Sequence, residues 1–223
     1  MLPKLLLSSL AVSLVAIATP VFAQDDDARI TVGVTGGSLG IGPSLGYRIN
    51  DVLGIRADAT FLGVSHGFDS DDVRYDGDVR LRSGGVQADI YPFGGGFRLS
   101  GGVRINGNRV NATGKPNATT YTFNGVTYQV SDVGTVSTRT EIKDVAPTLT
   151  LGYGGGMGRG FAFGIDAGVM FQGRVRIQPI TYTGPLQNAA LAANLEAERQ
   201  SLQKDIDDYK LYPILQIGLG YRF

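Results

Sequence analysis

The sequence predicts an all-β protein: an eight-stranded antiparallel transmembrane β-barrel with a helical insert before the last strand. Three observations predict this fold class. Apolar residues alternate with small or polar residues through most of the chain, which is the period of strands with one apolar face. The chain ends on such a segment. The connections between segments also alternate between short and long, as expected when a barrel keeps its short turns on one side of a membrane.

The last alternating segment runs from Leu211 to Phe223. Its odd-numbered positions are apolar throughout, whereas its even-numbered positions after Ile214 carry Gln216, two glycines and Arg222. A strand with one continuous apolar face suits a barrel whose outer surface is covered by lipid. We therefore expect this segment to close the barrel.

Composition narrows the class of protein. The chain has 223 residues, 33 glycines, one histidine, no cysteine and a formal net charge of +0. This length fits one domain. A neutral chain gives no electrostatic reason to expect nucleic acid as a partner, and the absence of cysteine removes disulfides and thiolate metal sites. The sequence predicts no cofactor and no metal ion.

The first 23 residues have the pattern of a secretory signal peptide. Lys4 provides the positive charge, an apolar run follows from Leu5 to Ile17, and Val21-Phe22-Ala23 resembles a cleavage site. We expect cleavage after Ala23. Residues 24–223 then form a single barrel domain, with an external helical insert at about 186–208.

Eight segments show the alternating pattern, and the fourth changes phase. Val79 and Leu81 share one parity, but Val86, Ala88 and Ile90 share the other. A β-bulge at Ser83–Gly85 would restore the outward apolar face. The expected strands cover about 30–35, 39–49, 53–61, 77–91, 97–106, 139–153, 161–172 and 211–223.

Three of the connections are long. A polar loop is expected from Ser65 to Asp76, and an Asn/Thr/Gly-rich stretch runs from Asn108 to about Ser137. Within that stretch, Asn124-Gly125 lies between two β-prone runs, which is the strongest short hairpin signal in the chain. The third connection holds the insert, in which leucines recur at nearly a helical period after Gly184-Pro185.

Aromatic residues gather where the short turns are expected. With both termini on the same side, these turns lie at Asn50-Asp51, at 92–96 and at 154–160. An aromatic girdle belongs at a membrane interface. The predicted girdle residues are Tyr47, Tyr91, Phe93, Tyr153, Tyr221 and Phe223.

Charged residues occupy positions that point into the barrel. A barrel of eight strands is filled by its own side chains, and an unpaired charge inside it would be costly. We expect ion pairs among Arg48, Arg56, Asp58, Asp89, Arg98, Arg104, Asp166 and Arg222. These pairs either form a core that sets the strand register or line a narrow path for ions or protons; conductance in planar bilayers distinguishes the two interpretations.

Four segments carry a resemblance to a known family. They are the leader, Gly46–Ile49, Asp89–Gly96 and the closing Gly220–Phe223. Together they resemble the small outer-membrane β-barrel proteins of the OmpA, OmpX, OmpW and opacity type, especially those of alpha-proteobacteria. The resemblance implies the outer membrane of a Gram-negative bacterium, contact with its lipid and lipopolysaccharide, and insertion by the barrel-assembly machinery through the C-terminal strand.

The residues argue against an enzyme. Ser65 and His66 are adjacent, so on a strand they would point to opposite faces and could not act as nucleophile and base. The aspartates between Asp69 and Asp78 lack the spacing of a calcium loop, which favours a solvated charge run. We therefore expect no catalytic and no metal-binding residues.

The function expected from these observations is a structural or surface-interaction role in the outer membrane, with a barrel filled by side chains and a surface ligand that the sequence does not name. The first alternative is a narrow passive channel for ions or small solutes. The second is a lipid-modifying enzyme, which lipid A mass spectrometry with and without the protein would reveal.

Overall fold

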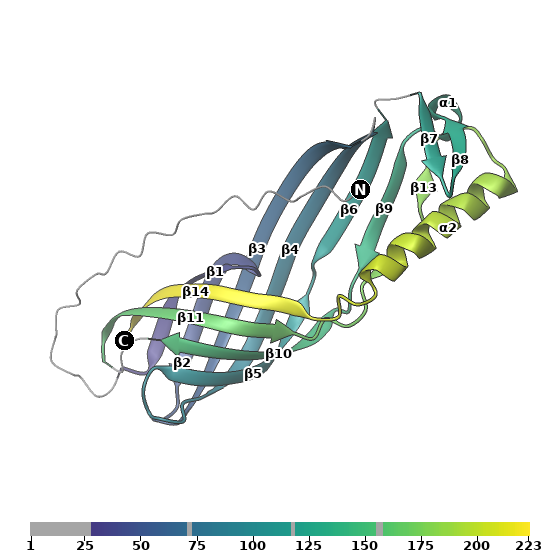
Figure 1. Cartoon of the computed structure of the whole chain (residues 1–223). Helices are drawn as coiled ribbons and strands as arrows, with labels where there is room; N and C mark the ends of the chain where they lie inside the picture. Colours follow the sequence, from purple (N-terminus) through teal and green to yellow (C-terminus); the bar gives the residue numbers. More distant parts are fainter. Residues whose placement is uncertain (1–27, 71–72, 117–118, 155–157) are drawn as a thin grey trace.

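The computed structural model describes residues 28–70, 73–116, 119–154 and 158–223. The expected signal peptide lies outside these residues. Within them, eight strands form a barrel (Figure 1): β1 (Ile30–Gly37), β2 (Gly40–Arg48), β3 (Leu53–Ser70), β4 (Val73–Ile90), β5 (Phe97–Asn106), β10 (Val145–Gly154), β11 (Gly160–Met170) and β14 (Tyr212–Arg222).

The barrel is closed by the first and last of these strands. Each strand is antiparallel to both neighbours, in the order β1–β2–β3–β4–β5–β10–β11–β14, and β14 pairs with β1. In that closing pair, Val32 lies opposite Tyr221 and Gly36 lies opposite Ile217. Closure leaves no free strand edge in the barrel wall. The predicted fold class is confirmed.

The outer surface of the barrel is apolar. Ile30, Val32 and Val34 on β1 are exposed, while the residues between them are half-buried. The same alternation continues through Leu215, Ile217 and Leu219 on β14. Large apolar side chains exposed all around a closed barrel are typical of a surface covered by lipid.

None of the helices in the described part of the chain is both long and apolar enough to cross a membrane.

Strands β3 and β4 continue beyond the rest of the barrel as a long hairpin (Figure 1). Their ladder runs without interruption from Leu53 opposite Ile90 to Ser70 opposite Val73. The expected loop from Ser65 to Asp76 is therefore wrong, since most of it is paired strand. Polar composition indicated a loop, but two strands that leave the membrane can be polar and still satisfy each other's backbone groups.

The predicted β-bulge at Ser83–Gly85 is also wrong. The β3–β4 register is constant on both sides of Gly84, and so is the register of β4 with β5. The phase changes because the surroundings change. On the N-terminal side of Ser83, β4 lies outside the barrel. Its inner face there does not border the lumen, and apolar residues such as Leu81 and Val79 can occupy it. We call β3, β4 and the strands added to them beyond the barrel the extension.

The extension is widened by strands from the two long connections. β6 (Arg109–Pro116) pairs with β4, and β9 (Val136–Glu141) pairs with β6. Two short strands, β12 (Arg176–Ile177) and β13 (Thr181–Tyr182), pair with β9. The sixth barrel strand therefore begins at Val145, and residues 139–141, which were expected in it, belong to β9 outside the barrel.

A small hairpin lies at the tip of the extension, as predicted. β7 (Thr120–Phe123) and β8 (Val126–Gln129) join at Asn124 and Gly125, whose φ angles are 49° and 76°. Positive φ at both residues is the conformation of the tight hairpin turn that Asn-Gly favours. The short helix α1 (Val130–Val133) follows and leads to β9.

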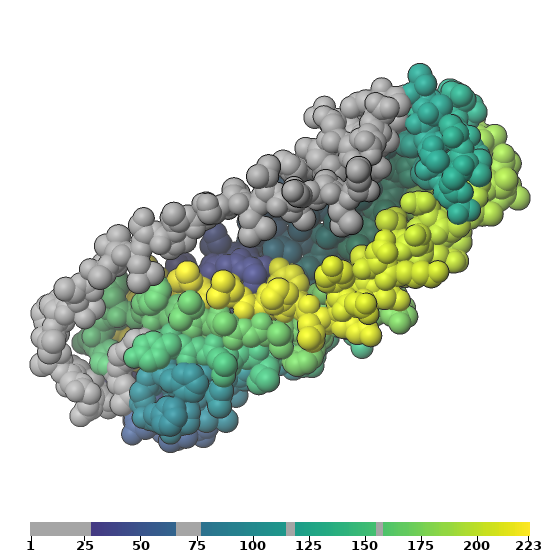
Figure 2. Space-filling model, viewed as in Figure 1, coloured from purple at the N-terminus to yellow at the C-terminus, as the bar shows by residue number. Residues whose placement is uncertain are grey.

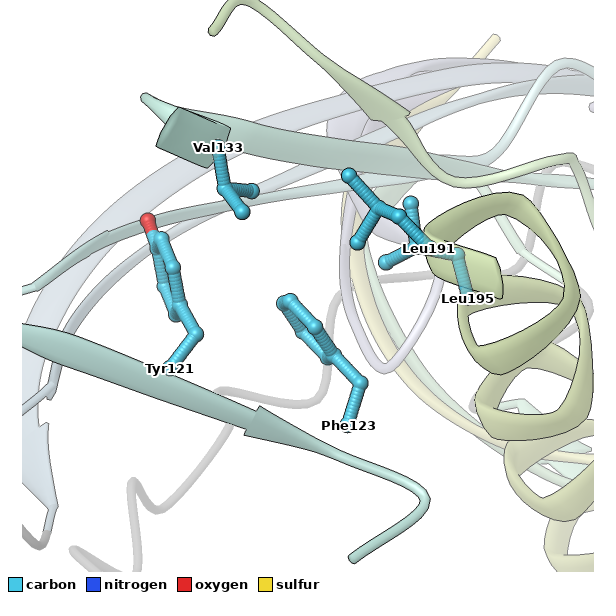
Figure 3. Packing of buried hydrophobic residues seen from close by; sticks show 5 residues of the cluster. All are labelled: Tyr121, Phe123, Val133, Leu191 and Leu195. Carbon is cyan, nitrogen blue, oxygen red and sulfur yellow. The ribbon is translucent and has the colours of Figure 1, made fainter. Parts of the chain in front are cut away.

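The predicted helical insert is α2 (Ala189–Ile206), which starts and ends slightly inside the expected range. Its N-cap is Asn188, whose side-chain oxygen accepts a hydrogen bond from the backbone of Leu191 at 2.6 Å. Leu191 and Leu195 are buried against Tyr121, Phe123 and Val133 (Figure 3). These five residues form the tip core.

The exposed side of α2 carries an ion pair between Glu196 and Arg199 at 2.6 Å. Hydrogen bonds from Arg199 and Gln200 lower the pKa of Glu196 to about 2. The molecule is elongated, with the barrel at one end and β7, β8 and α2 at the other (Figure 2). We call the end of the barrel with the short turns the short-turn end, and its opposite end, from which the extension continues, the long-loop end.

Candidate functional site

The candidate site is the lumen of the barrel, because inward-facing positions bring together polar side chains from all of its strands. Period-two alternation places Arg56, Asp58, Asp89, Arg98 and Asp166 on the inner face. A cavity of about 130 Å³ is lined by four of them, Arg56, Asp58, Arg98 and Asp166. What the lumen can do depends on how these groups pair and on what closes its ends.

One group of ion pairs crosses the lumen. Arg56 on β3 donates to Asp89 on β4 at 2.6 Å and to Asp166 on β11 at 2.9 Å. Arg98 on β5 donates to the same carboxylate of Asp166 at 2.7 Å. Because β3 and β11 are not neighbours in the wall, the contact from Arg56 to Asp166 ties opposite parts of the barrel together.

The carboxylate of Asp89 is fully buried and has further donors. The hydroxyl of Ser100 donates to it at 2.6 Å, and that of Tyr91 lies 3.4 Å away. A buried carboxylate is stable only when its oxygens are paired and hydrogen-bonded. Asp89 meets this condition through residues of β3, β5 and the end of β4.

A second ion pair lies closer to the long-loop end. Arg104 on β5 pairs with Asp58 on β3 and donates to the Ser83 hydroxyl at 3.1 Å. Its side chain is 1% exposed. Asp58, Asp89 and Asp166 all meet arginines, so the three carboxylates of the predicted set are paired in the structure.

The other two predicted arginines lie at the short-turn end. The Arg48 guanidinium stacks on the ring of Tyr91, 3.6 Å from its centre, and donates to the carbonyl oxygens of Asp51 and Gly94 at 2.8 and 3.0 Å. Arg222 donates to the Thr31 hydroxyl at 3.2 Å. Arg48 therefore braces two short turns instead of joining the carboxylates.

Tyr91 does not belong to the aromatic girdle, and that part of the prediction is wrong. It is buried beneath Arg48, with its hydroxyl directed at Asp89. The outward residues of β4 near this end are Val86, Ala88 and Ile90. The next position therefore points inward, although its place beside a turn suggested an interface residue.

The remaining predicted girdle residues lie near the short-turn end. Tyr47, Phe93, Tyr153 and Phe223 are exposed there. Tyr221 contacts Phe223, with ring centres 5.0 Å apart, and Phe161, with ring centres 5.7 Å apart. Phe161 lies opposite Tyr221 in the β11–β14 ladder, and it extends this aromatic group beyond the predicted set.

Apolar side chains gather inside the barrel at its long-loop end. Leu39, Ala146, Met170 and Ile214 are buried against one another, with Tyr212 packed beside them. We call these four buried residues the apolar plug. The hydroxyl of Tyr212 donates to the carbonyl of Ser38, which holds the β1–β2 turn over them. A hydrophobic constriction of this kind opposes the passage of water and ions.

The plug was missed by sequence reasoning. Alternation does place Met170 and Ile214 on the inner face, but only the charged residues of that face were predicted to interact. An apolar residue on an inner face is the available signal, and it becomes informative only once the strand ends are known. Leu39 was expected to begin the second strand on the outward face of Ile41, and this is wrong: it lies in the turn before β2 and is buried.

The cavity runs along the lumen from the plug, past the ion pairs, to Arg48 and Arg222 at the short-turn end. Its lining includes Thr35, Arg56, Arg104, Thr150 and Gln216. Both amide atoms of Gln216 are buried and have no hydrogen-bond partner among the described residues. The cavity therefore has unpaired polar atoms in its lining and the chemistry to hold water.

Ser65 and His66, the pair considered as a hydrolase site, lie in the extension and not in the lumen. His66 lies in the β3–β4 ladder opposite Gly77, and its neighbour Ser65 lies opposite Asp78. Across the described ranges, three or more potential metal-ligating side chains do not gather at any point. Asp71 and Asp72 of the acidic run lie outside the described residues.

Solved structures that share this fold include two from Acinetobacter baumannii. Acinetobacter baumannii CarO aligns with a TM-score of 0.58 and 19% sequence identity, over 90% of this chain and 100% of that chain. CarO2 of the same species aligns with a TM-score of 0.60 and 16% identity, over 88% and 99% respectively. No protein-family model and no curated protein matches the chain. The likeness is one of fold, and it does not point to the OmpA, OmpX, OmpW or opacity type in particular.

Proposed function

We propose that the protein is an integral barrel of a Gram-negative outer membrane, in which a filled barrel anchors the extension at the cell surface in a structural or interaction role. The observation that carries this proposal is the contrast between the two ends. The lumen is crossed by ion pairs and holds the apolar plug at its long-loop end. The long-loop end, in contrast, builds an ordered sheet and helix with a core of its own.

The orientation follows from the asymmetry of the connections. Short turns lie on the periplasmic side of such barrels, and longer connections lie outside. The extension and α2 would then project from the cell, in contact with lipopolysaccharide. Removal of residues 1–23 on export, and insertion by the barrel-assembly machinery through β14, belong to the same proposal.

Planar-bilayer recording tests the filled barrel. We expect the processed protein to give no steady conductance, because ions would have to pass both the plug and the pair of Arg56 with Asp166. A large-pore porin in the same lipid serves as the positive control. Stable, ohmic openings of the wild-type protein would overturn the proposal.

The second candidate is a narrow passive channel, favoured by the cavity of about 130 Å³. Its lining runs from Leu39 and Ile214 at one end to Arg48 and Arg222 at the other. Under this candidate the plug acts as the gate, so Met170→Ala with Ile214→Ala should raise conductance above a wild-type level that is already measurable. Under the filled-barrel proposal, the wild-type level is zero.

A further inference from the structure

Four exposed arginines lie on the outer face of the extension. Arg80 on β4 and Arg109 on β6 are directly opposite in the ladder. Arg82 is two residues from Arg80 and therefore shares its face. Arg139 on β9 lies opposite Asn111, which is two residues from Arg109. We call Arg80, Arg82, Arg109 and Arg139 the outer-face arginine cluster.

The positive charge of this cluster exceeds the negative charge that faces it. Asp78 pairs with Arg80 at 3.1 Å, and it lies opposite Asn111 on the same face. Glu141 on β9 lies opposite another arginine, Arg176, and accepts a hydrogen bond from Gln178. Among the described neighbours, the four guanidinium groups of the cluster thus have one carboxylate beside them, that of Asp78, because Glu141 lies opposite Arg176. Like charges directly opposite in a ladder are destabilising, so a bound anion would stabilise this face.

The cluster begins where the apolar exterior ends. Arg82 lies opposite Phe61, which is exposed on the outer face, and the next outward residue pair toward the short-turn end is Ala59 with Gly84. Ile105, also exposed, lies opposite Gly84. At about 3.3 Å per residue, the row of Arg80 and Arg109 lies roughly 7 Å beyond Arg82. The headgroup layer beyond each face of the hydrocarbon is about 5–8 Å thick.

We propose that the outer-face arginine cluster binds the phosphate groups of an anionic lipid in the leaflet on the long-loop side, with the acyl chains of that lipid against the apolar exterior below. Guanidinium groups match phosphate geometry with two parallel hydrogen bonds. The continuity of the cluster with the apolar surface favours a lipid over a soluble phosphate, because one ligand then satisfies both. This inference rests on the proposed membrane integration and deepens it by naming the lipid chemistry.

Lipid binding can be measured by native mass spectrometry of the processed protein in neutral detergent micelles. The probes are bis-phosphorylated lipid A, the same lipid after removal of its phosphates, and millimolar inorganic phosphate as competitor. The test variant is Arg80→Gln with Arg109→Gln. The matched control is Arg29→Gln with Arg159→Gln, which removes the same charge from exposed positions near the short-turn end.

We expect the test variant to bind phosphorylated lipid A roughly thirtyfold more weakly, from about 1 kcal/mol for each arginine near an anionic surface. The control variant should bind like the wild type, and dephosphorylated lipid should bind weakly to all three. Equal binding by test and control variants would overturn the inference. So would complete displacement by inorganic phosphate, since that would assign the cluster to a free anion.

The fold is followed in the same samples by the shift in gel migration on heating. If the protein fails to form a heat-modifiable barrel at all, the proposed function fails. If the barrel forms but the test variant binds lipid A as tightly as the wild type, only the lipid inference fails.

Discussion

At the scale of residues, the lumen depends on buried and half-buried charges that pair with one another. Alternation correctly indicated that Arg56, Asp58 and Asp166 face inward, because the direction of a side chain on a strand depends only on parity. It could not indicate which arginine meets which aspartate. Arg56 and Asp166 are 110 residues apart, and their contact depends on the closure of the whole barrel. Tyr91 was misplaced because its position beside a turn suggested a membrane interface, whereas it shares the inward parity of Asp89.

The pair of Arg104 with Asp58 provides a direct test of the filled lumen. Arg104→Ala leaves the Asp58 carboxylate without its charged partner, and the expected loss in the free energy of unfolding is about 3–5 kcal/mol. Replacing both residues with apolar ones of similar size, Arg104→Met with Asp58→Leu, should restore most of it. Urea unfolding in lipid vesicles, followed by heat-modifiable migration, measures both effects.

The exposed Arg159 on a short turn serves as the matched control. Arg159→Ala should change stability by about 0.5 kcal/mol or less. If Arg104→Ala were as mild as this control, the buried pair would not stabilise the barrel.

For two inward-facing glycines, we expect an added methyl group to have opposite effects on the free energy of unfolding. A Cβ on Gly42 would lie 1.8 Å from the carbonyl oxygen of Ala59, whereas a Cβ on Gly218 would have no neighbour closer than 3.8 Å. Gly42→Ala should therefore cost about 1–3 kcal/mol. Gly218→Ala should be neutral or stabilise by about 0.4–1 kcal/mol, because it restricts the unfolded chain. The same unfolding assay compares them, and equal losses would contradict the geometry of β2 against β3.

At the scale of elements, the barrel strands could be predicted from the sequence, whereas the strands of the extension could not. Each barrel strand has one face on lipid and one on the lumen, which enforces alternation. The extension lies beyond the apolar exterior of the barrel, so β6 and β9 carry little periodicity and were included in a loop. Their pairing with β4 joins distant segments, which a local pattern cannot reveal. The β7–β8 hairpin was predictable because its signal, Asn124-Gly125, is local.

Helix α2 stabilises the tip of the extension and makes no contribution to the barrel wall. Leu191 is fully buried in the tip core. Leu191→Ala should therefore loosen the β7–β8 hairpin by about 2–5 kcal/mol. Limited proteolysis should then cut near Asn124 faster than in the wild type, while the heat-modifiable barrel stays intact.

Leu202 on the same helix is the control, because it is 39% exposed. Leu202→Ala should leave the cleavage rate near that of the wild type. Loss of the folded barrel in Leu191→Ala would contradict the separation of tip core and barrel.

At the scale of the whole molecule, one closed sheet satisfies the backbone of the barrel and turns its apolar side chains outward. The same sheet continues past the barrel as the extension, where exposed arginines replace the apolar residues. Fold class was predictable from the whole chain, since eight alternating segments permit few other architectures. The apolar plug was not, because it forms from four elements that only the folded barrel brings together.

Lipid contact along β14 tests this account most directly, and the cysteine-free chain allows one nitroxide label at a time. Labels at positions 215–219 of the processed protein in vesicles would be probed with oxygen and with a water-soluble nickel chelate. We expect high oxygen and low nickel access at Leu215, Ile217 and Leu219, and low access to both reagents at Gln216 and Gly218. Nickel access at the three outward positions, or no alternation between the two sets, would contradict a lipid-covered barrel with a filled lumen.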